Sequence, residues 1–356
     1  MKSLLSTLLL CGAAAFASAQ TSVSDYVPGA VENGVVYFLP KTALQVDIEI
    51  EKKTYKPGEF ARYGERYLGL KDVVAEGGTE WTMKKISLKQ RGVPDKEKAY
   101  FIKYKDNTSA VLVSLSEEGI LQAINTRPQT KDRREREDMG GGRESVKKTD
   151  VQQYMTQEIL MANSTAKKAE LIANEIYSIR ESRNLFLRGE ADNMPGDNES
   201  LTIILSKLDE QEKALTELFT GTVEVEDITY TVDVIPEGNL DAEPIFRFSK
   251  AFGVVDSDDL CGEPVYMTVE GADIIPEPAE VEEKKKSNKY EGVIYNIPGM
   301  AHVSLFTKDA TLIERDVMIA QFGTTEVLTN NLFNKKTATK VLFDDSNGGL
   351  VRIERE

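Results

Sequence analysis

Residues 34–40 read Gly-Val-Val-Tyr-Phe-Leu-Pro, and residues 292–298 read Gly-Val-Ile-Tyr-Asn-Ile-Pro. Both stretches begin with glycine, carry tyrosine in the fourth position and end with proline, and an alanine follows at Ala43 and at Ala301. β-branched and aromatic residues favour an extended strand, whereas proline cannot donate to a strand ladder and so marks a strand end or edge. Each stretch therefore predicts a strand that opens a β unit.

A second match lies downstream of each stretch. Residues 61–64, Ala-Arg-Tyr-Gly, resemble residues 320–323, Ala-Gln-Phe-Gly. The first segment begins 24 residues after Tyr37, and the second begins 25 residues after Tyr295. Two matches in nearly the same register indicate that one β unit is used twice, near each end of the chain. The closing glycine suits a tight turn or a bulge. In such a duplication, Tyr37 and Tyr295 should occupy the same topological setting.

Hydrophobic residues with a period of two surround the first copy. The alternation is clearest at Leu44, Val46, Ile48 and Ile50. Such alternation is typical of a half-buried antiparallel strand, and it predicts an N-terminal β domain over residues 20–126. Residues 127–149 are interpreted as an exposed linker, because they carry many charges and three consecutive glycines and have almost nothing to bury.

A helical hairpin is predicted over residues 150–221. Asp150 and Gln153 form an acidic variant of the capping box, and helical periodicity then continues to Gly189, with room for a break near residues 163–165. After a turn at residues 195–197, one apolar stripe at spacings of three, four and seven runs to Gly221. Two helices joined by a short loop form an αα-hairpin.

The period of two returns after the hairpin and predicts a C-terminal β domain over residues 222–356. Residues 273–289 are rich in charge and contain two prolines, and they are interpreted as a solvated loop within this domain. Residues 345–349, Asp-Ser-Asn-Gly-Gly, have the turn chemistry of a closing hairpin. The sequence thus predicts an α+β protein with two antiparallel β domains, sandwich-like or barrel-like, that flank a helical hairpin.

The first 19 residues have the pattern of a secretory signal peptide. Lys2 precedes an apolar run from Leu4 to Ala15, and Ala17-Ser18-Ala19 offers small residues for cleavage after Ala19. No later run approaches the roughly 18–20 apolar residues that span a bilayer, so we expect no transmembrane segment. We expect an exported protein of the periplasm, the cell envelope or the extracellular space. Cys261 would then lack an intramolecular disulfide partner.

Composition excludes several classes of function. The chain of 356 residues has 59 acidic and 44 basic residues, a formal net charge of −15 and one histidine, His302. The negative charge opposes binding to phosphate backbones, so nucleic acid is not an expected partner. A single histidine excludes catalytic and metal sites that need two. The remaining nucleophilic option is a pair of Cys261 with His302, although the cysteine lacks the local signature of papain-like enzymes.

Arg180, Arg183 and Arg188 are the candidate anion or ligand contacts. They lie toward the end of the first long helix, where their guanidinium groups could converge on one anion. The alternative is that they complement the helix dipole and pair with Glu210 or Glu212 of the second helix.

Two further groups have functional and structural interpretations. Phe60, Tyr63 and Tyr67 could form a ligand surface, but core packing of a short amphipathic turn is favoured. Residues 256–259, Asp-Ser-Asp-Asp, resemble the start of a calcium loop, but Leu260 takes the third ligand position, so an acidic turn is favoured. We therefore predict no catalytic residue, no cofactor and no metal.

Several blocks of the chain resemble one protein family. They are residues 34–40, 55–58, 61–63, 183–190, 208–212, 218–221 and 319–323. These blocks are similar to an uncharacterised family of exported Bacteroidetes proteins known as domain of unknown function 4831, over nearly the whole mature chain. The resemblance implies a Gram-negative envelope or secreted location, and it supplies neither an activity nor a catalytic residue.

The sequence favours a non-catalytic binding or scaffold protein whose partner is a protein or glycan of the cell envelope. The alternative is a hydrolase that uses Asp and Glu on glycans, because that chemistry needs only two carboxylates across the bond. A deep cleft with facing carboxylates would favour the hydrolase, whereas an exposed edge strand or apolar patch would favour the binding protein.

Overall fold

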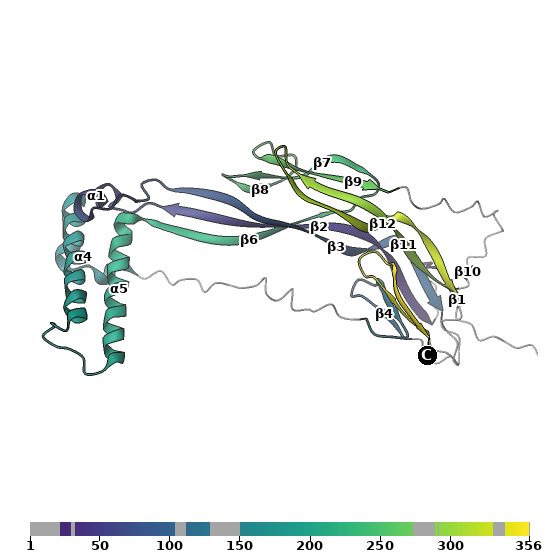
Figure 1. Cartoon of the computed structure of the whole chain (residues 1–356), viewed down its shortest axis with the longest axis horizontal. Coiled ribbons are helices and arrows are strands. Elements are labelled where there is room, and N and C mark those ends of the chain that lie inside the picture. The colour runs from purple at the N-terminus through teal and green to yellow at the C-terminus, as the bar shows by residue number, and fades with distance from the viewer. Residues whose placement is uncertain are drawn as a thin grey trace, which may run out of the picture.

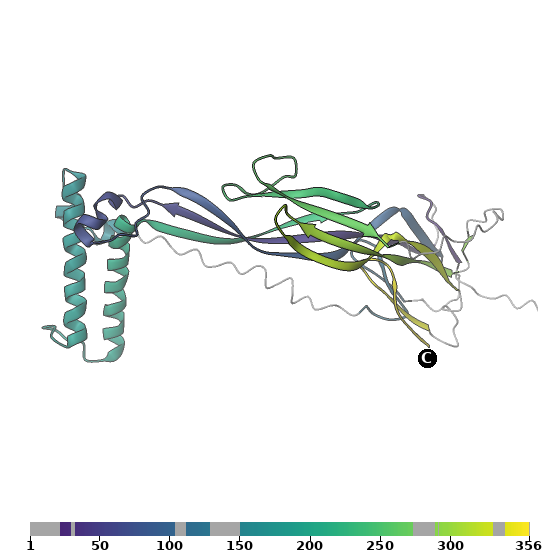
Figure 2. The ribbon, with the colours of Figure 1, turned by 45° about the horizontal axis from the view of Figure 1, so that its top comes forward.

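The molecule is elongated, with a helical head at one end and a β-rich body at the other (Figures 1 and 2). The computed structural model describes residues 22–29, 33–103, 112–128, 150–272, 289–290, 292–329 and 339–355. The predicted α+β class with antiparallel sheets is confirmed. The predicted signal peptide, residues 129–149 of the predicted linker and residues 273–288 of the predicted charged loop lie outside the described residues.

The body contains three sheets. The first has the order β10 (Lys289–Tyr290), β1 (Ser22–Asp25), β3 (Gly78–Lys103), β2 (Gly34–Lys56) and β6 (Thr222–Val234). The second has the order β12 (Thr311–Thr329), β11 (Gly292–Phe306), β9 (Glu263–Gly271), β7 (Leu240–Ser249) and β8 (Gly253–Val255). The third has the order β14 (Leu350–Arg355), β13 (Thr339–Phe343), β5 (Leu121–Ile124) and β4 (Val113–Leu115).

The head consists of helices from two parts of the chain. The β2–β3 connection supplies the 3-10 helix η1 (Ala61–Tyr63) and α1 (Gly64–Leu68), and the central part supplies η3 (Val151–Tyr154), α3 (Gln157–Leu160), α4 (Thr165–Arg188) and α5 (Asn198–Thr220). The side chains of Ser164 and Asp197 cap α4 and α5 by accepting backbone N–H bonds. Gly189 ends α4 with a positive φ of 71°, as a left-handed C-cap requires.

Aromatic and aliphatic side chains hold the head together. Phe60 and Phe219 are fully buried, with ring centroids 5.7 Å apart, and Ile172, Ile176 and Leu215 complete the centre of the cluster. Phe60 comes from the β2–β3 connection, whereas the other four belong to α4 and α5. Burying a side chain of this size stabilises a fold by about 1.5–3 kcal/mol, so this cluster docks the helical hairpin on the end of β2.

The head joins three long strands, β2, β3 and β6, which we call the ribbon. The backbone N–H of Phe60 donates to the Leu218 carbonyl, and that of Val74 donates to the Thr220 carbonyl, both at 2.8 Å. Gly221 passes so close to β2 that a Cβ atom there would overlap the carbonyl oxygen of Lys56. Backbone bonds and close packing therefore fix the head to the ribbon.

The first and second sheets pack face to face. Leu44, Val46, Ile48 and Ile50 of β2 are at most 1% exposed, and they share one apolar cluster with side chains of β7, β9, β11 and β12. These four are the residues that alternate in the sequence, so the period of two predicted the buried face of β2.

All three sheets meet beside Thr42. β6 ends at Val234, opposite Leu44, and beyond that point the side chain of Gln321 bonds the backbone of β2. The Thr42 N–H donates to Gln321 Oε1 at 2.8 Å, and Gln321 Nε2 donates to the Thr42 carbonyl at 2.9 Å. Thr42 Oγ1 accepts from the Ala320 N–H and donates to the Ser346 carbonyl, both at 3.1 Å.

Two further buried side chains complete this junction. Asn296, which is 1% exposed, donates to the carbonyls of Pro40 and Asn347 at 3.0 and 2.9 Å. The hydroxyl of Tyr37 accepts from the Ile294 N–H at 3.0 Å and donates to the Ile294 carbonyl at 3.2 Å. We call Tyr37, Thr42, Asn296 and Gln321 the junction residues, because each connects strands of different sheets or a strand with the β13–β14 turn.

Tyr37 and Tyr295 occupy equivalent places in two sheets. Each lies near the start of a long strand that pairs antiparallel with the next strand and also pairs with a third strand, in the orders β3-β2-β6 and β12-β11-β9. Register shifts fall at the two prolines, between Phe38 and Pro40 and between Ile297 and Gly299. The first sequence match therefore corresponds to matching topology.

The second sequence match does not, and this part of the prediction is wrong. Residues 61–64 form η1 and the start of α1 in the head, whereas residues 320–323 continue β12. The physical reason is the environment of each segment: Phe60 packs on Phe219 and turns the first segment into the head, while Gln321 holds the second against β2.

The two predicted β regions share one body. β6 pairs with β2 over 13 residues, β13 pairs with β5, and β10 pairs with β1. Each region therefore supplies strands to the first and to the third sheet. In the described residues, no helix is both long enough and apolar enough to cross a membrane.

Gly323 allows β12 to pass the bulge of β11, where a Cβ atom would overlap the carbonyl oxygen of Ile297. We expect Gly323→Ala to lower the free energy of unfolding by about 1–3 kcal/mol, because the carbonyl group of Ile297 can make room for the new methyl group only if β11 and β12 move apart. Gly238→Ala is the matched control, since no heavy atom of the described residues lies within 4 Å of its Cβ position. Equal urea unfolding midpoints for the two variants would contradict this account.

Candidate functional site

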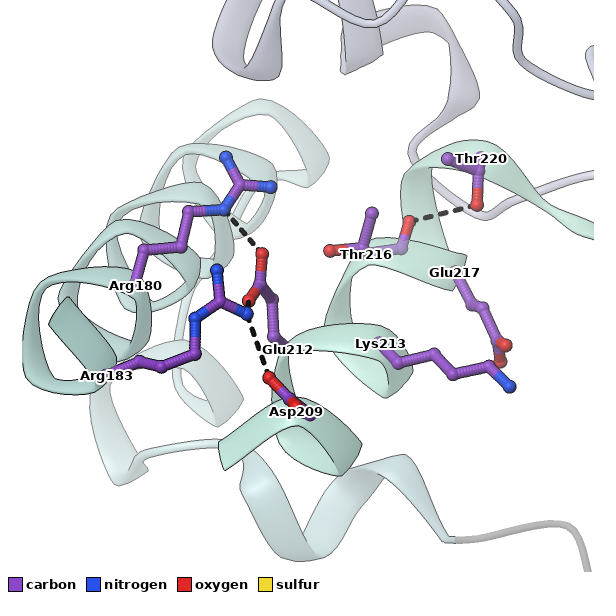
Figure 3. Close-up of a pocket in the computed structure, with 8 residues that line it drawn as sticks. All are labelled: Arg180, Arg183, Asp209, Glu212, Lys213, Thr216, Glu217 and Thr220. Atoms are coloured by element: carbon purple, nitrogen blue, oxygen red, sulfur yellow. Dashed lines mark hydrogen bonds and ion pairs between the residues drawn. The ribbon is translucent and has the colours of Figure 1, made fainter. Parts of the chain in front are cut away.

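A pocket of about 390 Å³ lies on the head between α4 and α5 (Figure 3). Its lining residues are Arg180, Arg183, Asp209, Glu212, Lys213, Thr216, Glu217 and Thr220. Two of the three predicted arginines are among them. Helical spacing explains the grouping, because residues three and four apart share a helix face.

The carboxylate of Glu212 lies between two guanidinium groups. Its Oε1 is 2.6 Å from Arg180 Nε, and its Oε2 is 2.7 Å from Arg183 Nη1. The same Arg183 nitrogen is 2.8 Å from Asp209 Oδ1. The Glu212 side chain is 15% exposed, so these charge-assisted bonds are partly shielded from water.

These contacts stabilise the charge of Arg183 and hold the two helices together. The bond to Asp209, and then the attraction of Glu212, raise the pKa of Arg183 above its usual value. The buried apolar residues of α4 end at Ile179, and those of α5 begin at Ala214. The ion pairs therefore connect the helices where the apolar core stops.

Arg188 does not join this group. It lies in the last turn of α4, is exposed, and is not among the residues that line the pocket. For Arg180 and Arg183 the geometry corresponds to the alternative interpretation, in which they pair with acids of the second helix. Glu212 is one of the two partners named from the sequence, whereas Glu210 pairs with Lys207 at 2.6 Å.

The pocket is suited to a polar group rather than to a free anion. Its lining has three basic and three acidic residues, so their formal charges sum to zero. The hydroxyl of Thr216 is buried without a hydrogen-bond partner in the described structure. Asp209 and Glu212 are both held by Arg183, which leaves them poorly placed for acid–base catalysis.

A second hollow, of about 470 Å³, lies at the base of the head. Glu59, Arg62, Glu65 and Lys71 give it a mixed charge. Sequence reasoning missed this hollow, and the only signal was the position of Arg62 beside an aromatic group. That aromatic group packs as predicted: Phe60 is buried in the head core, and Tyr63 and Tyr67 pack against that core.

Cys261 and His302 are not brought together. Cys261 precedes β9, which begins at Glu263, whereas His302 pairs with Glu270 near the far end of β9. The seven steps from Glu263 to Glu270 span about 23 Å at about 3.3 Å per residue. The one nucleophilic pair considered from the sequence is therefore contradicted by the strand register.

The acidic runs form turns. Asp259 accepts from the Cys261 N–H at 2.9 Å, and Asp344 accepts from the Ser346 N–H at 2.8 Å. Throughout the described ranges, no group of three or more His, Cys, Asp or Glu side chains could hold a metal ion. The turn interpretation of residues 256–259 agrees with this geometry.

Glu212→Gln tests the role of the ion pairs. We expect this variant to lower the free energy of unfolding by about 1–2 kcal/mol, because two guanidinium groups lose their shared carboxylate. Glu217→Gln is the matched control, because it changes the same pocket without removing an ion pair of the two arginines. Thermal unfolding checks the difference, and equal stability of the two variants would contradict the assigned role.

His302 should titrate above its usual range. The bond of its Nδ1 to Asp316, followed by that of its Nε2 to Glu314, raises the pKa of the imidazole. Because the pKa of His302 is higher in the folded protein than in the unfolded chain, protonated His302 stabilises the fold. This stabilisation is fully present below about pH 6.5, the pKa of histidine in an unfolded chain, and it is lost as the pH rises through the pKa that His302 has in the folded protein. NMR titration should show a lower His302 pKa in Asp316→Asn, with Asp309→Asn unchanged as the control.

The comparisons with known proteins point to one family. A family model described as a domain of unknown function (DUF4831) matches residues 33–351, which is nearly the whole chain. No curated protein matches, and no solved structure matches. Since the model covers the ribbon, the head and all three sheets, the chain belongs to the DUF4831 family.

Proposed function

We propose that this protein is an exported, non-catalytic scaffold of the cell envelope or the extracellular space, and that it binds a protein or glycan through its helical head. The observation that carries the proposal is the separation of the head from the body by the ribbon (Figure 1). β2 connects the two parts: its residues from Leu44 to Ile50 lie in the body, where they pack against the second sheet, and its last residues lead to the head.

The construction of the ribbon supports a fixed display of the head. β2 and β3 pair in 21 positions from Gly34 to Tyr55, and β6 flanks the half of β2 that leads to the head. Glycine contacts and backbone bonds then clamp the head to the ribbon. A surface held at a constant distance and orientation suits a scaffold, because a partner bound there keeps a defined position relative to the body.

The outer half of the helical hairpin offers a surface for such a partner. The buried apolar residues of the two helices lie near the ribbon, at residues 169–179 and 214–219. Farther out, Leu187 is 64% exposed and Ile203 is 57% exposed. Both side chains are exposed enough to contact a partner.

Export rests on the sequence pattern at the N-terminus, where Lys2, the apolar run and Ala17-Ser18-Ala19 match a signal peptide. Cleavage after Ala19 would leave Cys261 as the single cysteine. The thiol of Cys261 is exposed and forms a hydrogen bond with Asp259. The hydrolase alternative gains no support from the pocket between α4 and α5, because two of its three acids, Asp209 and Glu212, are engaged by arginine.

The proposal is tested in the cells that naturally produce the protein. The full chain, with a C-terminal tag, is crosslinked and purified alongside the variant Leu187→Asp/Ile203→Asp and the control Phe252→Asp/Leu260→Asp, whose side chains are 64% and 83% exposed on the body. We expect an N-terminus at Gln20 in the envelope or the medium, and a partner that the head variant alone fails to capture. Identical capture by all three proteins, or no capture, would contradict the proposal.

A further inference from the structure

The two long sheet edges of the body differ in how they are covered. On β12, Gln90 donates to the Met318 carbonyl at 2.7 Å, and the Ala320 N–H donates to Thr42 at 3.1 Å. Side chains of the first sheet thus bond the edge of β12 at Met318 and Ala320. On β6, β2 is the one strand partner within the described part of the chain, so the opposite edge of β6 is the end of its sheet.

As an edge strand, β6 is protected by acidic residues rather than by proline, a basic residue or a bulge. Its 13 residues, Thr222–Val234, contain no proline, lysine or arginine. Natural sheets discourage strand addition with such residues, with bulges or with very short edges. β6 instead pairs with β2 from Thr222 to Val234 without a register shift, so its outer edge is a long and regular template.

The side chains of β6 define what could be added. Glu224 and Glu226 lie on one face and remain 45% and 56% exposed, although they pair sideways with Lys56 and Lys52 of β2. Val223 and Val225 lie on the other face and are 46% and 40% exposed. Along residues 222–226, an incoming strand would therefore meet carboxylates on one face and β-branched apolar side chains on the other.

A second copy of β6 does not fit this edge. The strand has four acidic residues and no basic one, so two copies would place eight carboxylates on neighbouring strands. Like charges across a strand pair are destabilising. A partner with basic residues at alternate positions gains from the same carboxylates.

We propose that the outer edge of β6 accepts an extended segment of a partner protein as an added strand. This segment carries Lys or Arg on the face toward Glu224 and Glu226, and β-branched residues on the face toward Val223 and Val225. Main-chain hydrogen bonds supply the affinity, and the alternating side chains supply the specificity. The inference goes beyond the proposed function, because it places a second partner surface on the ribbon, apart from the head.

The test uses the purified mature protein and a fluorescent peptide of about ten residues that alternates lysine with valine or threonine. The first control is the same peptide with every second backbone nitrogen methylated, which keeps the charge and removes strand pairing. The variant Val225→Lys places a cation on the edge, and Val351→Lys is its matched control on β14, where Val351 is 62% exposed. Fluorescence anisotropy gives the affinities.

We expect the unmodified peptide to bind the wild type and Val351→Lys equally, and at least about tenfold more tightly than it binds Val225→Lys. The methylated peptide should lose affinity by a similar factor. Equal binding of both peptides, an unaffected Val225→Lys variant, or no binding at all would overturn the inference. Binding that appears only after Arg133, Arg134 and Arg136 are replaced by Ala would also overturn it, because the occupant would then be the chain itself.

A further comparison separates this inference from the scaffold proposal. The variant Leu187→Asp/Ile203→Asp changes the head and leaves β6 intact, so it should bind the peptide as the wild type does. Loss of peptide binding in this head variant would overturn the assignment of the site to β6. If the head variant captures no partner in cells but binds the peptide normally, this result concerns only the binding surface of the head and leaves the assignment of the peptide site to β6 unchanged.

Discussion

The need to satisfy every buried backbone group where three sheets meet governs the architecture of the body. Thr42 is fully buried, and its N–H and carbonyl are bonded by one glutamine side chain, Gln321, 279 residues away. An unpaired buried backbone group costs about 1–3 kcal/mol, so the register of β12 against β2 cannot change without a penalty of that size. Asn296 performs the same task for two carbonyls and so fixes the β13–β14 turn on the same spot.

The sequence predicted what depends on local periodicity. The alternation from Leu44 to Ile50 identified the buried face of β2, and the capping residues and glycines identified the helical hairpin, including the break before α4. Periodicity reveals the face of a strand but not its partner, and for that reason the pairing of β6 with β2 and of β13 with β5 could not be predicted. The short motif at residues 61–64 has no period of its own, so its surroundings decide its conformation.

The candidate site was predictable to the same extent. Helical spacing placed Arg180 and Arg183 on one face of α4 and named Glu212 as a partner on α5. The sequence did not reveal that one carboxylate would serve both arginines, because this depends on how far the two helices are rotated toward each other. Gln321 and Asn296 carried no signal at all, since their contacts connect residues far apart in the chain.

The interleaving of strands has a consequence for the order in which the chain acquires its structure. Val341 and Phe343 of β13 pack in the same cluster as Tyr37 and Leu39 of β2. Ribosomes make the N-terminal strand long before the strand that covers it, so this half of the body stays open during synthesis. Contacts of such high sequence separation close slowly, so the nascent chain exposes the apolar face of β2 until its last strands emerge.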